Sequence, residues 1–64
     1  MEGTVVRLMK DKMFGFIRTS GGTDFFFHAS AVKNIKFVDL SIGMKVQFEE
    51  GESPKGPRAE DIYV

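Results

Sequence analysis

The chain has 64 residues, 42% of them hydrophobic, and its nine basic residues balance its nine acidic ones, so the formal net charge is zero. This length predicts one domain with a small core, and the neutral balance argues against a polycation that coats nucleic acid indiscriminately. The absence of cysteine and the single histidine exclude disulfides, thiolate metal sites and histidine clusters for zinc. We therefore expect no metal and no cofactor.

The location of the protein follows from its apolar segments. No apolar run approaches the roughly 18 residues of a membrane span, and no signal peptide precedes the first expected strand. We expect a soluble, cytoplasmic protein that does not contact membranes.

Short alternating segments separated by turn residues predict strands, and no window carries the apolar spacing of a long helix. We expect five strands, at residues 2–10, 14–19, 24–29, 44–50 and 57–64. The SGGTD segment at 20–24 predicts a tight hairpin, and GESPKGP at 51–57 predicts a looser loop whose prolines cannot donate to a sheet. The irregular stretch between the third and fourth strands begins with one expected helical turn, Ser30–Lys33.

Five short strands in so short a chain predict an all-β fold. Closing the sheet removes the edges that a flat sheet would expose, which favours a small five-stranded antiparallel β-barrel. We expect residues 1–64 to form this barrel as a single domain.

Phenylalanine is concentrated in the stretch KMFGFIRTSGGTDFFFHAS, residues 12–30, which contains five phenylalanines and the only histidine. Successive side chains of a strand point to opposite faces of the sheet. Ile17 is the natural core residue of its strand, so we expect Phe14 and Phe16 to face outward. Gly15, between these rings, is interpreted as a slim backbone position where a base lies close.

The next strand sorts its side chains in the same way. Phe25 and Phe27 are expected to face the interior, and Phe26 and His28 to face outward. The hairpin at 20–24 makes the two strands neighbours, so four flat side chains are expected to form one aromatic patch: Phe14, Phe16, Phe26 and His28. The expected core consists of Val5, Ile17, Phe25, Phe27, Val32, Leu40, Val46, Phe48 and Ile62.

Contiguous exposed apolar side chains on a soluble monomer usually mark an interaction site. Rings spaced along strands with basic residues nearby suit single-stranded nucleic acid, because every base has a face to stack and cations follow the phosphates. The alternative is a protein-interaction barrel whose aromatic face binds a peptide or a second copy of the chain.

Asp24, His28 and Ser30 stand at alternate positions of one expected strand and could in principle serve as an acid, a base and a nucleophile. Consecutive same-face residues of a strand lie roughly 7 Å apart, too far for direct hydrogen bonds unless the strand bends. His28 is interpreted instead as a base contact and Ser30 as the cap of the following turn. We expect a protein that is not an enzyme.

Two motifs then carry a family resemblance. The pattern K-x-F-G-F-I at 12–17, followed by D-x-F-x-H-x-S-A at 24–31, resembles the two ribonucleoprotein-type motifs of the bacterial cold shock proteins. The resemblance extends over the chain, through EGTV at 2–5, FVDLSIGMKVQF at 37–48 and KGPRAEDIYV at 55–64. It implies a barrel of the oligonucleotide-binding (OB) type that binds single-stranded RNA and DNA, pyrimidine-rich strands included. It also implies an RNA-chaperone role in the cold-shock response and effects on transcription and translation.

The resemblance also implies which side chains bind. Base or phosphate contacts fall on Lys12, Phe14, Phe16, Phe26, His28 and Phe37, and a basic contact of the last loop falls on Lys55. We expect a monomer, with a strand-exchanged dimer as the alternative.

The chain departs from the family pattern at several of these positions. The family usually has tryptophan at the position of Arg7 and phenylalanine at that of Ala29, so two stacking rings are missing. Arg7 is interpreted as a partial substitute, because its planar guanidinium stacks on a base and keeps a positive charge. Phe25 and Phe27 replace smaller β-branched residues, so room for them must be found elsewhere in the core.

Overall fold

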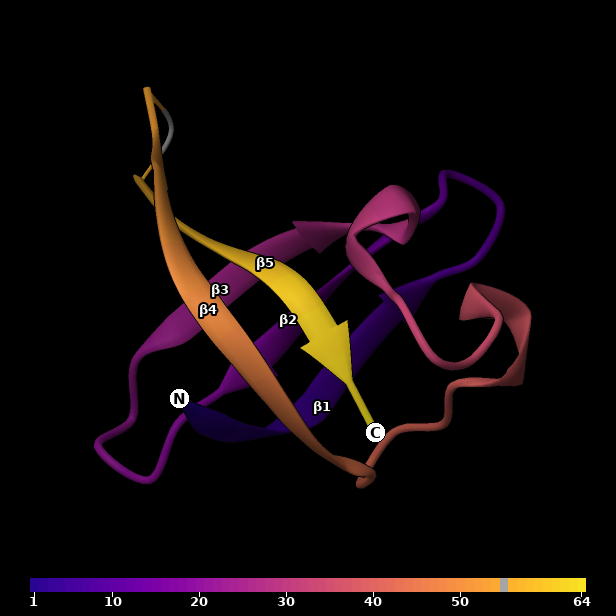
Figure 1. The fold of residues 1–64 in the computed structure, drawn as a ribbon, viewed down its shortest axis with the longest axis horizontal. Coiled ribbons are helices and arrows are strands. Elements are labelled where there is room, and N and C mark those ends of the chain that lie inside the picture. The colour runs from indigo at the N-terminus through magenta and orange to yellow at the C-terminus, as the bar shows by residue number, and fades with distance from the viewer. Residues whose placement is uncertain (55) are drawn as a thin grey trace.

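The computed structural model describes residues 1–54 and 56–64, which form five strands and two short 3₁₀ helices. The strands are β1 (Glu2–Met9), β2 (Phe14–Arg18), β3 (Asp24–His28), β4 (Lys45–Ser53) and β5 (Gly56–Tyr63). The helices are η1 (Ala29–Ala31) and η2 (Phe37–Asp39), both between β3 and β4 (Figure 1). The expected all-β fold is confirmed.

The strands close into a barrel in the order β1-β2-β3-β5-β4, with β4 pairing back onto β1. The consecutive pairs β1–β2, β2–β3 and β4–β5 are antiparallel, and so is β1–β4. The β3–β5 pair is parallel, with Phe26 opposite Arg58. The expectation of a wholly antiparallel barrel was therefore wrong for this one pair. The cause is the long connection after β3: β4 joins β1, and β5, antiparallel to β4, then closes the barrel alongside β3.

The ends of the elements differ from the sequence-based expectation mainly around the last hairpin. β4 continues to Ser53 and β5 begins at Gly56, so residues 51–53 and 56–57 of the expected loop belong to paired strands. Figure 1 shows this β4–β5 hairpin projecting beyond the barrel. Pro57 lies opposite Glu52 within the ribbon. A proline is tolerated there because a two-stranded ribbon has outer edges that need no further donor.

Eight of the nine expected core residues are buried; Val32 is half-buried and packs against the core from outside. The core also contains three residues that the sequence analysis did not place there, namely Ala31, Phe37 and Ala59. Phe25 packs against Phe48 with ring centroids 5.1 Å apart.

Gly15 explains how the barrel admits the second inward ring, Phe27. Gly15 is buried and lies opposite Phe27 in the β2–β3 pair. A β-carbon at Gly15 would lie 2.9 Å from the Phe27 ring and 2.6 Å from the carbonyl oxygen of Arg7. The interpretation of Gly15 as a slim place for a base was therefore wrong, since the missing side chain makes room on the inside of the sheet.

Candidate nucleic-acid interface

Three phenylalanine rings form a continuous cluster on the outer face of β2 and β3. Phe16 lies directly opposite Phe26 in the antiparallel pair, and the next pair on the same face joins Phe14 to His28. The ring centroids are 5.6 Å apart for Phe14 and Phe26, 5.9 Å for Phe16 and Phe26, and 6.1 Å for Phe14 and Phe16. The three rings are half-buried and His28 is exposed, so the aromatic patch assembles as expected.

The patch is held in place by the residues that alternate with it. Ile17, Phe25 and Phe27 fill the interior, each at most 2% exposed. Because successive side chains of a strand point to opposite faces, burying these three side chains fixes Phe16 and Phe26 on the outside. The core therefore determines where the stacking surface lies.

His28 has a defined orientation at the end of β3, where the chain turns into η1. Its Nδ1 accepts a hydrogen bond from the backbone N–H of Ser30 at 3.1 Å and lies 3.0 Å from the Ser30 hydroxyl oxygen. A backbone amide can only donate, so the neutral ring must carry its proton on Nε2. His28, and not Ser30 as expected, is thus the residue that caps η1.

The acid–base–nucleophile arrangement considered for Asp24, His28 and Ser30 does not assemble. His28 and Ser30 come within hydrogen-bonding distance because the chain leaves the strand at Ala29. Asp24, at the other end of β3, is bound by Arg18 through Nε–Oδ1 and Nη2–Oδ2 contacts of 2.7 and 3.1 Å. These hydrogen bonds lower the pKa of Asp24 below its ordinary value. The Asp24 carboxylate therefore pairs with Arg18 at the surface and not with His28.

Basic side chains flank the patch on one side. Arg7 is exposed on β1 and lies opposite Phe16, just after a β-bulge between Val5 and Arg7. Lys12 is exposed in the turn between β1 and β2, where its backbone N–H donates a hydrogen bond to the backbone carbonyl of Met9 at 3.1 Å. Lys55, the expected contact of the last loop, lies outside the described residues.

Phe37 does not lie on the open surface with the other rings. It is 5% exposed, and its ring packs edge-on against Phe27 with centroids 6.0 Å apart. The helix η2 turns the chain so that Phe37 and Leu40 enter the core while Val38 stays exposed. Phe37 is thus mostly buried, but it also lines a surface hollow together with His28, and its role as a base contact stays a prediction.

Sequence analysis missed Arg58, which lies on the outer face beside the patch. The parallel β3–β5 pairing sets Arg58 directly opposite Phe26, and the two side chains line the same cavity. Its place depends on the pairing of residues 26 and 58, which are 32 positions apart in the chain, and an all-antiparallel barrel gave no reason to expect that contact. The cluster of Pro57 and Arg58 after a loop was the one available signal.

Residues 1–54 and 56–64 contain no group of three or more acidic, histidine or cysteine side chains that could hold a metal ion. They also contain no helix long and apolar enough to cross a membrane.

Comparison with known proteins gives a consistent picture. The family model described as the 'Cold-shock' DNA-binding domain matches residues 1–64. The chain is 43% identical over 60 residues to the cold shock-like protein CspLB of Listeria monocytogenes, covering 94% of this chain and 91% of that protein. It is also 43% identical over 61 residues to the major cold shock protein of Streptococcus pyogenes, covering 95% and 91%.

A solved structure supports the fold. The structure titled drosophila Unr CSD456 superposes with a TM-score of 0.70 at 24% identity, covering 97% of this chain and 25% of that one. At this identity the likeness bears on the barrel alone.

Proposed function

The chain belongs to the cold-shock domain family of nucleic-acid-binding proteins, which are not enzymes, and on that premise we propose that it binds single-stranded RNA and DNA through the aromatic patch. The observation that carries the proposal is the cluster of Phe14, Phe16 and Phe26 on one outer face, with His28 and Arg7 at its borders. Soluble domains keep such rings inside unless something binds them.

The physical mechanism is capture of unstacked bases. Each base stacked on an aromatic ring contributes about 1–3 kcal/mol, and a duplex offers no free base face to the patch. Arg7, Lys12 and Lys55 supply positive charge for the phosphates. Binding the open strand shifts the equilibrium away from hairpins without ATP, which is the action of an RNA chaperone.

The wider role follows the family. We propose that residues 1–64 are a single cold-shock domain that acts as a monomer in the cytoplasm, as an RNA chaperone in the cold-shock response, and in control of transcription and translation. Pyrimidine-rich strands are the preferred ligands in this proposal, because flexible pyrimidine runs unstack at low cost.

The test is a titration with heptathymidine and with a duplex of equal length, at several salt concentrations. We expect saturable binding of the single strand and weak binding of the duplex. With three or four phosphate contacts, log K should fall with log salt with a slope of roughly −2 to −3. A slope steeper than about −5 would show that charge and not stacking dominates, and equal affinity for the duplex would refute the stacking mechanism.

A matched pair of variants tests whether the patch is the site. Phe16→Ala should weaken heptathymidine binding by about 1–3 kcal/mol. The control is Tyr63→Ala, which removes a ring that is 49% exposed at the end of β5, opposite Gln47 and outside the patch. Equal losses in both variants, or an unaffected Phe16→Ala, would favour the alternative of a peptide-binding or self-associating face.

A further inference from the structure

A cavity of about 410 Å³ lies between the aromatic patch and the β4–β5 hairpin. One wall consists of the Phe16 and Phe26 rings, and the opposite wall comes from the hairpin, namely Ser53, Pro54, Pro57 and Arg58. Phenylalanine and proline rings on either side suit a flat, largely apolar ligand group, and a nucleobase is such a group. We call this space the Arg58 cavity.

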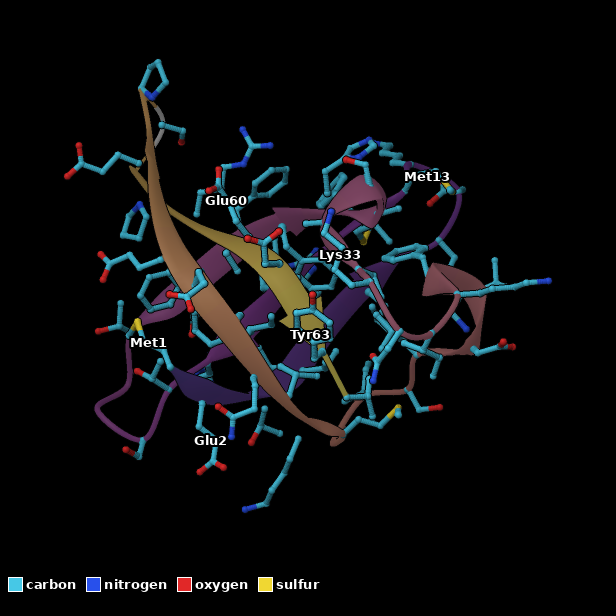
Figure 2. The ribbon with its side chains drawn as sticks, in the orientation of Figure 1. Met1, Glu2, Met13, Lys33, Glu60 and Tyr63 are labelled. Carbon is cyan, nitrogen blue, oxygen red and sulfur yellow. The ribbon has the colours of Figure 1, made fainter. Side chains whose placement is uncertain are left out.

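Arg58 is the charged group at this cavity. Its Nε is buried and has no hydrogen-bond partner among the described residues. Its nearest anion is Glu60, with 3.9 Å between Nε and Oε1, an ion pair beyond hydrogen-bonding distance. Figure 2 shows Glu60 on the outward side of β5, toward the hairpin. The Arg58 side chain is 39% exposed although its Nε is buried, so the terminal Nη groups are the donors that a ligand can reach.

Arg58 lies where its side chain can reach a base that stacks on Phe26. The two residues face each other across the parallel β3–β5 pair, on the same outer face of the barrel. A base stacked against Phe26 would therefore present an edge to the guanidinium. Since a guanidinium has only donors, in a planar fork, the edge that matches it must carry two adjacent acceptors.

The bases differ in that respect. Guanine presents O6 and N7 side by side and is the usual bidentate partner of arginine, whereas adenine pairs its N7 with an N6 donor that opposes the guanidinium. We propose that the Arg58 cavity holds one guanine of the bound strand, with O6 and N7 accepting from Arg58 and the ring stacked on Phe26. This inference rests on the proposed binding of single strands and adds a base preference at one position.

The test uses heptathymidine in which a single guanine replaces each thymine in turn. We expect one position at which guanine tightens binding by roughly 5- to 150-fold over thymine, the range of a good bidentate contact. Adenine at that position should give a clearly smaller gain, although its ring stacks as well. 7-Deazaguanine, which has a C–H in place of N7, should lose most of the gain on the unaltered protein.

Variants of Arg58 locate the effect. Arg58→Lys keeps the charge and loses the planar fork, so it should lose the guanine gain, measured as the ratio of affinities for the guanine-containing strand and heptathymidine. The matched control is Arg18→Lys, an exposed arginine of β2 outside the cavity, which should keep the gain. Circular dichroism checks that both variants fold, and the 7-deazaguanine result stands without them.

The outcomes separate the two proposals. Tight binding of heptathymidine with no guanine gain at any position, or an equal gain with adenine, cytosine or 7-deazaguanine, would overturn the guanine assignment alone. A gain that survives in Arg58→Lys would also overturn it. No binding of any single strand would overturn the proposed function, and the guanine assignment with it.

Discussion

Phe26 and Phe27 are neighbours in β3, yet one belongs to the aromatic patch and the other to the core, so replacing each with alanine separates binding from stability. Phe27 is fully buried, with its ring against Phe37 and above Gly15. Phe26 is half-buried and touches the rings of Phe14 and Phe16 on the outer face.

The two costs can be estimated from these contacts. Removing a buried phenylalanine ring costs about 3–5 kcal/mol. Typical stabilities of roughly 0.05–0.15 kcal/mol per residue give about 3–10 kcal/mol for a chain of 64 residues, so Phe27→Ala should unfold much of the population. Phe26→Ala loses two ring contacts of about 0.5–1.5 kcal/mol each, and should stay folded.

Binding should respond in the opposite order. Phe26→Ala should weaken heptathymidine binding by about 1–3 kcal/mol, which is roughly 5- to 150-fold in Kd. Phe27→Ala should bind nearly as the parent does once corrected for its folded fraction. Urea titrations followed by circular dichroism give the stabilities, and fluorescence anisotropy of a labelled oligonucleotide gives the affinities. Greater destabilisation by Phe26→Ala than by Phe27→Ala would refute the assignment of faces.

Three further changes test single features. Arg7→Trp should tighten heptathymidine binding by about 1–3 kcal/mol, because a large ring beside Phe16 adds a stacking face; a folded variant that binds no better would show that Arg7 already stacks. Met13→Gly should raise the free energy of unfolding by up to about 1 kcal/mol, because Met13 has a φ of 63°, and an unchanged urea midpoint would contradict strain there. Asp24→Asn should lower stability at neutral pH, where the depressed pKa of Asp24 makes its ion pair with Arg18 stabilising. The difference from the parent should vanish as the pH falls through the folded pKa, below the ordinary value of 3.8, and a difference that persists in acid would exclude the ion pair as its cause.

The sequence predicted the strands and the patch well because both depend on a local rule. Side chains alternate along a strand, so one certain core residue, Ile17, determines the direction of every other side chain in β2. The hairpin after Arg18 then carries the assignment to β3, whose partner residues lie directly opposite. Each of these steps involves residues close together in the chain.

The burial of Phe37 and the place of Arg58 beside the patch could not be predicted, because both depend on contacts between residues distant in the chain. Phe37 lies in a segment with no strand period, and its burial follows from the way η2 packs against the end of the barrel. Arg58 reaches the patch through the parallel β3–β5 pair, which exists because the chain crosses the barrel between β3 and β4. Alternation contains no information about either.

Three consecutive phenylalanines in β3 would allow the strand to shift by one residue against β2 and still bury aromatic rings. A slip would bury Phe26 and expose Phe25 and Phe27, at little cost in hydrophobicity alone. Two contacts with β2 oppose it. Only a glycine leaves room for the Phe27 ring, and Gly15 lies opposite Phe27 in the observed register alone.

The second contact is at the other end of the strand, where Arg18 lies opposite Asp24 and binds it through two hydrogen bonds. A slip would move the carboxylate to the other face of the sheet and break both. An exposed ion pair adds little to stability, but here it discriminates between two registers that bury nearly the same rings. Gly15 and the Arg18–Asp24 pair, neither of which belongs to the aromatic patch, therefore decide that Phe26 and His28 face outward.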